Sequence, residues 1–253
     1  MPFLNHFKNV FFCFLTFFIL NGCLQKSFRH DRCMVWKNPH QEYIMFMSVP
    51  KVIIYKEKNS TASCTAFPYR FENNKYYFVT AAHCVAEDDL NTKKVKILAK
   101  KVELDFRLYP FYKTKPVEAK IVAVGYKEVG DDFAILEVEL SFNVSLLKFS
   151  HKEAVVGECV LNVSYPKEAK GNIFYGTISQ INKKSPQFIV NFDNINDAHG
   201  SSGSAIVSCE SNEILGILVS QHTVDRRNIY YIKIDDFINF ERQVRKGKYT
   251  YYK

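Results

Sequence analysis

Three polar residues that lie far apart in the sequence have the side chains that nucleophilic catalysis needs. Ser202 lies in a short polar stretch, residues 200–205, which leads directly into an apolar run. A serine hydroxyl is a poor nucleophile near neutral pH, so an imidazole must accept its proton and a carboxylate must orient that imidazole. His83 and Asp132 are the upstream residues that could supply these two groups. Together the three residues predict acyl transfer through an activated serine.

The glycines around Ser202 suit a tight turn at a nucleophile. Gly200 and Gly203 can adopt backbone conformations that are closed to other residues, which lets successive N–H groups point at one place. If Ser202 is the nucleophile, its own N–H and that of Gly200 could stabilise an oxyanion. Runs of glycine and serine are also common in plain loops, so the prediction depends on His83 and Asp132.

His83 and Asp132 both lie next to predicted strands. His83 follows a strand-like run at 76–80, where a lone histidine is usually structural. Asp132 precedes the apolar run 133–136, and a buried carboxylate there requires a polar partner such as a histidine N–H. Asp131 is the alternative carboxylate, but side chains alternate along a strand, so it would point the other way.

The elements that must position these residues are predicted to be strands. From Val52 onward, short apolar runs rich in β-branched and aromatic residues alternate with turn residues, which favours about a dozen strands in barrels or a sandwich. Near the end, Asp235 and Asp236 precede apolar residues that share one helical face, and Arg245 follows them. This pattern predicts one short helix. The least patterned segment, 141–151, is the predicted domain boundary.

Residues 1–22 are predicted to be an export signal. A lysine precedes a short apolar core at 10–20, and small or polar residues follow. The sequence Leu-Asn-Gly-Cys at 20–23 also resembles a bacterial lipobox, in which Cys23 would be lipidated and become the N-terminus. A plain secretory signal and an uncleaved anchor are the alternatives, and all three place the folded part outside the cytoplasm. Residues 23–48 show no clear period and are predicted to form a surface arm.

The composition excludes few classes of protein, but it restricts the binding partners that the chain is expected to have. The chain has 253 residues, of which 47% are hydrophobic and 24% charged, so it can form one or two ordinary globular cores. Its net charge of +8 comes from scattered lysines and arginines. Such a surface could bind nucleic acid or anionic lipid, but a solvated surface is the simpler interpretation, and no nucleic-acid partner is expected. Beyond the N-terminal segment, no run of 18 apolar residues predicts a membrane span.

The cysteines that would remain after export favour disulfides. They form no Cys-x-x-Cys pair and show no metal-ligand spacing with histidines, so neither a metal nor a cofactor is expected. In an exported chain, disulfides are the better interpretation. The residues concerned are Cys33, Cys64, Cys84, Cys159 and Cys209, together with Cys23 if it is not lipidated.

Three stretches, 80–84, 132–136 and 200–205, resemble the signature motifs of trypsin-like (chymotrypsin-fold) serine peptidases of the bacterial type. They occur in the family's order of His, Asp and Ser, and the resemblance covers roughly residues 50–245. It implies an all-β fold of two six-stranded antiparallel barrels, at 49–145 and 146–253, with a short C-terminal helix in the second. It also implies a site in the cleft between the barrels, with the residue roles that follow. His83 is the general base, Asp132 orients it, Ser202 is the nucleophile, and the N–H groups of Gly200 and Ser202 form the oxyanion hole.

The resemblance also suggests how the cysteines pair. It implies one bridge between Cys64 and Cys84, across the hairpin at the histidine, and a second between Cys159 and Cys209. Cys33 is then left over, either free or bridged to an unlipidated Cys23.

Departures from the family pattern concern activation and specificity. Animal digestive members carry an aspartate before the nucleophile that pairs with a freshly cut N-terminus, whereas this chain has Ser201, so activation should not need a new amine. The Gly-Ser-Ala sequence at 203–205 is similar to that of glutamyl endopeptidases. However, the histidine on which those enzymes depend for specificity is matched here by Leu218.

The specificity pocket can be assigned roughly by the same resemblance. The register places Asn196 at the floor of the pocket with Asp197 beside it. Whether the floor is charged and selects Lys or Arg is therefore left open. Ser220 stands near the triad, and His222 and Ile229 occupy wall positions where trypsin has glycines. Side chains of that size imply a shallow pocket and a preference for small or medium uncharged residues before the scissile bond.

The leading prediction is therefore a monomeric serine endopeptidase, exported to the cell envelope or secreted, whose partner is a protein or peptide substrate. Attachment to a membrane would be through the N-terminus. A non-catalytic envelope-anchored binding module on the same fold is the alternative, although no member of the triad is missing. An esterase on another fold would need the order Ser, Asp, His and a helix directly after the serine, and neither is present.

Overall fold

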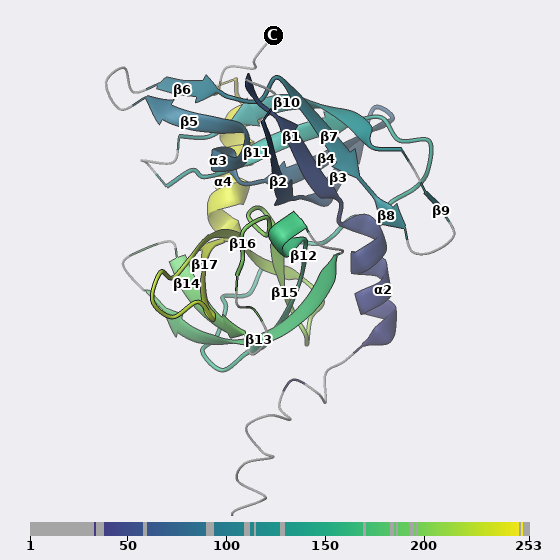
Figure 1. Cartoon of the computed structure of the whole chain (residues 1–253). Coiled ribbons are helices and arrows are strands. Elements are labelled where there is room, and N and C mark those ends of the chain that lie inside the picture. Colours follow the sequence, from purple (N-terminus) through teal and green to yellow (C-terminus); the bar gives the residue numbers. More distant parts are fainter. Residues whose placement is uncertain are drawn as a thin grey trace, which may run out of the picture. The chain divides into compact units, whose positions relative to one another are not determined.

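The computed structural model describes Cys33 and residues 38–249, apart from short gaps at 58–59, 90–93, 109–111, 114, 127–129, 169–170, 183–184, 186, 193–194, 196 and 248. The predicted signal peptide and Cys23 therefore lie outside the described residues. Residues 38–253 fall in one compact unit, which contains two β structures and two helices of ten or more residues (Figure 1).

The first β structure is a seven-stranded antiparallel sheet. Its strand order is β2-β1-β7-β10-β11-β4-β3. The strands are β1 (Lys51–Tyr55), β2 (Thr61–Thr65), β3 (Phe67–Glu72), β4 (Lys75–Thr80), β7 (Lys101–Asp105), β10 (Val117–Val124) and β11 (Ala134–Val138). Two small ribbons extend from it, β5 (Ala86–Asp89) with β6 (Lys94–Ile97), and β8 (Arg107–Leu108) with β9 (Tyr112–Lys113).

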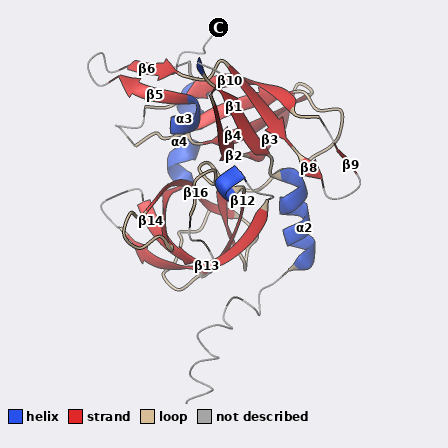
Figure 2. Ribbon diagram, viewed as in Figure 1, coloured by secondary structure: helices blue, strands red, loops and turns tan. Residues whose placement is uncertain are grey.

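The second β structure is a closed six-stranded barrel with the order β12-β13-β14-β17-β16-β15. Its strands are β12 (Cys159–Ser164), β13 (Asn172–Ile181), β14 (Gln187–Phe192), β15 (Ala205–Ser208), β16 (Ile214–Gln221) and β17 (Asn228–Lys233), with the short 3-10 helix η4 (Pro166–Glu168) after β12. Strands dominate both halves of this unit (Figure 2).

The predicted all-β class, the second six-stranded barrel and the C-terminal helix are confirmed, whereas the first half differs in detail. It is a half-barrel sheet of seven strands in which β2 and β3 form the two edges. These strands are consecutive in the chain and are separated only by Ala66. These two edge strands do not pair with each other, so the sheet does not close into a barrel.

Residues 39–48 differ from the predicted irregular arm. They form helix α2 (Pro39–Ser48), capped by the Asn38 carboxamide, which accepts hydrogen bonds from the N–H groups of His40 and Gln41. Met45 is fully buried in the core cluster that also receives side chains from both β structures. The apolar pattern did not predict this helix because its apolar face is narrow. The Asn-Pro pair at its start is nevertheless a known helix signal.

The C-terminal helix α4 (Ile234–Arg245) connects the two β structures. It begins with Asp235 and Asp236, as expected for residues that favour the positive end of the helix dipole. Phe237, which is fully buried, packs edge-on against Tyr69 and Phe133 of the first sheet, with ring centroids at 5.2 and 5.5 Å. Because α4 follows the last barrel strand, these contacts attach the barrel to the first sheet.

One of the two predicted disulfides is present and the other is not. Cys64 and Cys84 are bonded, with a Cα–Cα distance of 6.3 Å. Cys209 is a buried free thiol whose sulfur lies 3.1 Å from that of Cys159, so the predicted Cys159–Cys209 bridge is wrong. Cys159 and Cys33 are both disulfide-bonded, so Cys33 is not free. A sulfur that already forms one disulfide cannot form a second, which leaves Cys209 reduced.

Candidate active site

His83 and Asp132 meet as the sequence predicted. His83 lies on the four-residue helix α3 (Ala82–Val85), which follows β4, and Asp132 directly precedes β11, the neighbour of β4 in the sheet. The His83 ring Nδ1 lies 2.8 Å from Asp132 Oδ2, and the His83 backbone N–H donates to Oδ1 at 3.0 Å. Asp132 is buried, whereas the side chain of His83 is 32% exposed. The carboxylate is thus held by the residue that it orients, and the rest of the ring stays open to the surface.

Asp131 points elsewhere. Its carboxylate accepts a hydrogen bond from the Tyr249 hydroxyl, near the C-terminus of the described chain. Partial burial raises the pKa of this carboxyl group above its ordinary value, although the hydrogen bond from Tyr249 opposes the shift. The alternative carboxylate is therefore not in contact with His83.

The loop that carries Ser202 needs its two glycines. Gly200 and Gly203 have φ angles of +92° and +85°, a region that side chains rarely adopt. A Cβ atom at Gly200 would also lie 2.5 Å from the Tyr165 carbonyl oxygen, and one at Gly203 would lie 2.4 Å from that of Thr65. The loop is therefore both left-handed and packed too tightly against its neighbours for any larger residue.

Within the described part of the chain, two N–H groups of this loop have no hydrogen-bond partner. The carbonyl oxygen of His199 accepts a hydrogen bond from the Lys167 N–H at 2.6 Å. In a trans peptide the N–H points opposite to the carbonyl, so the N–H of Gly200 faces away from Lys167. Among the described residues, neither Gly200 nor Ser202 donates a backbone hydrogen bond, whereas Ser201, Gly203 and Ser204 do. The two predicted oxyanion-hole donors are thus available to a ligand.

His83 and Ser202 line one pocket of about 440 Å³. The lining also includes Asp197, Ser220 and His222, three of the predicted specificity residues. No hydrogen bond joins the Ser202 hydroxyl to the His83 ring among the contacts of the described residues. Such bonds are often long in unliganded enzymes and shorten when the substrate binds.

The remaining specificity predictions have different outcomes. Asn196 lies outside the described residues. Ile229 is fully buried in the core of the barrel and does not contribute to the lining of the pocket. The Asp197 carboxylate is already paired, at 2.5 Å from His199 Nδ1 and 3.3 Å from Lys167 Nζ. The hydrogen bond from the His199 side chain is the main cause that lowers the pKa of Asp197 to about 2.

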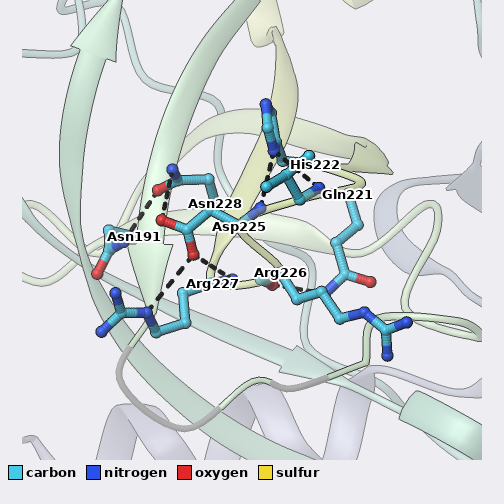
Figure 3. Close-up of polar contacts among 8 residues, drawn as sticks. Asn191, Gln221, His222, Asp225, Arg226, Arg227 and Asn228 are labelled. Carbon is cyan, nitrogen blue, oxygen red and sulfur yellow. Dashed lines mark hydrogen bonds and ion pairs between the residues drawn. The ribbon is translucent and has the colours of Figure 1, made fainter.

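The hairpin turn between β16 and β17 forms one wall of this pocket and is held by its own side chains (Figure 3). The His222 Nδ1 atom accepts the N–H groups of Val224 and Asp225, at 3.2 and 3.0 Å, so its neutral ring carries the proton on Nε2. The Asp225 carboxylate caps the backbone N–H of Arg227 and accepts from the Asn228 side chain. The wall is therefore ordered without a ligand.

The sequence did not predict two residues outside the nucleophile loop that hold the loop in place by hydrogen bonds. The Thr65 hydroxyl donates to the Gly200 carbonyl at 2.9 Å, and the Gln221 side chain accepts from the Ala198 N–H at 3.1 Å while it donates to the Arg226 carbonyl. Thr65 directly follows Cys64 in the sequence, which was the only available signal. Gln221, at the end of a strand, gave none.

Comparison with known proteins shows which family the chain belongs to. The family model described as "Trypsin-like peptidase domain" matches residues 64–217, which is more than half of the chain. The chain belongs to the trypsin-like peptidase family. The matched range contains His83, Asp132 and Ser202. No curated protein sequence matches the chain.

Solved structures share the fold of this family member at low sequence identity. The active form of the Rv3671c protease from M. tuberculosis is 18% identical, with a TM-score of 0.60, and the match covers 79% of this chain and 81% of that one. The serine endoprotease from Yersinia pestis is 17% identical, with a TM-score of 0.63 and coverage of 83% and 68%. The HtrA-type protease AlgW with tripeptide is 15% identical, with a TM-score of 0.63 and coverage of 83% and 64%.

No group of three or more His, Cys, Asp or Glu side chains within the described ranges could hold a metal ion. Over the same part of the chain, no helix is both long and apolar enough to cross a membrane.

Proposed function

We propose that the protein is a serine endopeptidase that hydrolyses peptide bonds through His83, Asp132 and Ser202 and an acyl-enzyme intermediate. The observation that carries the proposal is the pairing of His83 Nδ1 with the buried Asp132, at the edge of a pocket that Ser202 also lines. Membership of the trypsin-like peptidase family supports the same reaction class.

The first step follows from the orientation of the imidazole. Because Asp132 accepts a hydrogen bond from the Nδ1–H group, the neutral ring of His83 presents a lone pair on Nε2. That nitrogen can take the proton of the Ser202 hydroxyl as the serine oxygen attacks the substrate carbonyl carbon. Asp132 then stabilises the imidazolium that forms, because it is buried and negatively charged.

The second step depends on the unpaired backbone donors. When the carbonyl becomes tetrahedral, the N–H groups of Gly200 and Ser202 would hold its negative oxygen. His83 returns its proton to the leaving amine, which breaks the peptide bond and leaves an acyl group on Ser202. A water molecule activated by His83 then hydrolyses this ester and restores the serine.

Activity on an unstructured protein, measured for the wild type and Ser202→Ala, tests the proposal. Losing the nucleophile of a triad costs about 10⁶ in turnover, so the variant should be inactive. A fluorophosphonate label separates this function from a non-catalytic binding module. We expect an adduct on Ser202 of the wild type and none on Ser202→Ala. A folded wild type that neither cleaves nor takes the label would instead support the binding module.

The pocket supports a preference for small or medium uncharged residues before the scissile bond. Asp197 cannot readily serve a substrate Lys or Arg, because its carboxylate already contacts the His199 ring and the Lys167 ammonium group. His222 adds bulk at the wall and stacks on Tyr230, with ring centroids at 6.0 Å. Cleavage of a peptide library should therefore favour residues such as Ala or Val at this position. Efficient cleavage after Arg would contradict the preference.

We also propose that the enzyme acts outside the cytoplasm as a monomer. The apolar N-terminal segment supports export, and so does the disulfide between Cys64 and Cys84, since disulfides persist mainly in oxidising compartments. Mass analysis of the mature N-terminus would test lipidation of Cys23, with Cys23→Ser as the control. A mature protein that retains residues 1–22 would contradict cleavage. Light scattering of the secreted form would test the monomer.

A further inference from the structure

Four consecutive peptide groups, from 199–200 to 202–203, include the two whose N–H groups have no partner among the described residues. The carbonyl oxygen of each of the four accepts a hydrogen bond. The His199 carbonyl accepts from the Lys167 N–H, and the Ser201 carbonyl accepts from the Ser204 N–H at 3.0 Å. The carbonyls of Gly200 and Ser202 are both held by one residue outside the loop, Thr65.

Thr65 holds these two carbonyls with different groups. Its side-chain hydroxyl donates to the Gly200 carbonyl at 2.9 Å, and its backbone N–H donates to the Ser202 carbonyl at the same distance. The hydroxyl in turn accepts the Tyr165 N–H at 3.2 Å, which fixes its direction. The Thr65 carbonyl accepts from the Thr80 hydroxyl at 2.8 Å. Thr65 is fully buried, so water does not compete for these contacts.

Hydrogen bonds within the loop, from Ser204 to Ser201 and from Ser201 to Ala198, supply only part of this order. The hydroxyl of Ser201 is buried and has no partner among the described residues. Gly200 and Gly203, which the loop requires, allow many backbone conformations, so the peptides beside Ser202 can rotate unless something outside the loop prevents it. Thr65 lies at the end of β2 in the first sheet, whereas Ser202 lies three positions before the barrel strand β15. The contact therefore connects the half that carries His83 to the half that carries the nucleophile.

We propose that Thr65 is a positioning residue of the active site. Its hydroxyl fixes the peptide between Gly200 and Ser201, which lies between the two peptides that carry the oxyanion-hole donors, and so keeps both donors facing the substrate. This inference rests on the proposed function. Preorganised donors contribute to rate only if they are already aimed at the developing charge, and loss of one donor costs about 10²–10³ in turnover. Thr65 touches neither the substrate nor the reacting atoms, and acts through Gly200.

Thr65→Val and Thr65→Ser provide the central comparison. Valine has nearly the same shape but no hydroxyl, whereas serine keeps the hydroxyl. With a peptide chosen from the library, we expect Thr65→Val to lower kcat by about 10- to 100-fold with KM changed by less than about threefold, because the defect arises in the transition state. Thr65→Ser should return kcat to within about threefold of the wild type.

Ser48→Ala is the matched control. Ser48 is also buried, and its hydroxyl accepts the Ser145 N–H at 3.1 Å, but it has no hydrogen bond to the nucleophile loop. Like Thr65→Val, this variant loses a buried hydroxyl group that forms hydrogen bonds. It should therefore lose stability while kcat stays unchanged. A peptide aldehyde of the same sequence adds a second readout, since it forms a tetrahedral adduct with a negatively charged oxygen. Thr65→Val should lower the affinity for the aldehyde by about the same factor as it lowers kcat.

The outcomes separate this inference from the proposed function. Unchanged kcat in Thr65→Val, or an equal loss in Ser48→Ala, would overturn the role of Thr65 while the wild type remains an active peptidase. An inactive wild type without a Ser202 adduct would instead overturn the proposed function. If Thr65→Val does not fold, Thr65→Ala removes the same hydroxyl without filling the space, and the same kcat and aldehyde criteria apply to it.

Discussion

Asp132 accepts two hydrogen bonds from His83, one from the ring Nδ1 and one from the backbone N–H, on its two separate carboxylate oxygens. The backbone contact fixes the carboxylate relative to the main chain of α3. The ring contact then fixes the tautomer of His83. A buried acid with both oxygens used in this way has few other orientations available.

Replacement of Asp132 by Asn should remove most of the activity while the fold is kept. An asparagine amide can donate to Nδ1, which would place the ring proton on Nε2 and block acceptance of the serine proton. The expected loss is about 10⁴ in kcat. Asp131→Asn is the neighbouring control, because Asp131 contacts Tyr249 rather than His83. Similar losses in the two variants would contradict the assignment of Asp132.

The placement of the candidate site residues was predictable from the sequence, because each of them lies close to a strand with a strong apolar pattern. The run before His83 became β4, and the run after Asp132 became β11, which pair in register with Thr80 opposite Ala134. Strand pairing alone therefore brings the two residues together. The run after Ser202 became β15 in the same way.

The parts that were missed depend on contacts between distant segments. The Thr65 hydroxyl reaches Gly200 across 135 positions of the chain, and no local pattern encodes such a contact. The prediction of a Cys159–Cys209 disulfide was wrong for a related reason. The two sulfurs are close, as the family pattern suggests, but the presence of another disulfide at Cys159 could not be deduced from spacing.

The disulfide between Cys64 and Cys84 should stabilise the first sheet. It closes a loop of 20 positions and is buried at both ends. In the chain-entropy description, a bridge of this size contributes about 3 kcal/mol to the free energy of unfolding. A Cys64→Ala, Cys84→Ala double variant should lose an amount of this order in urea unfolding. A loss of under about 1 kcal/mol would mean that the unfolded chain is already restricted there.

Helix α2 should contribute to stability although its sequence looked irregular. Met45→Ala would leave a cavity in the shared core and should cost about 2–5 kcal/mol in urea unfolding. Asn38→Ala removes the N-cap and should cost about 1 kcal/mol. Tyr43 lies on the same helix with 61% exposure, and Tyr43→Ser should stay within about 0.5 kcal/mol of the wild type. Equal effects at Met45 and Tyr43 would contradict the packing of α2.

The pairing of Asp197 with His199 and Lys167 should appear as a dependence of stability on acid pH. The pKa of Asp197 is about 2 in the folded protein, with the His199 side chain as the largest cause, and an unperturbed aspartate has a pKa of about 3.9. Because the folded pKa is lowered, the stabilisation is complete above the unfolded pKa and disappears as the pH falls toward 2. In urea unfolding, the wild type should therefore have a higher free energy of unfolding than Asp197→Asn at pH 5. This difference should become smaller between about pH 4 and pH 2. A difference that stays constant over this range would mean that His199 and Lys167 do not hold the carboxylate in solution.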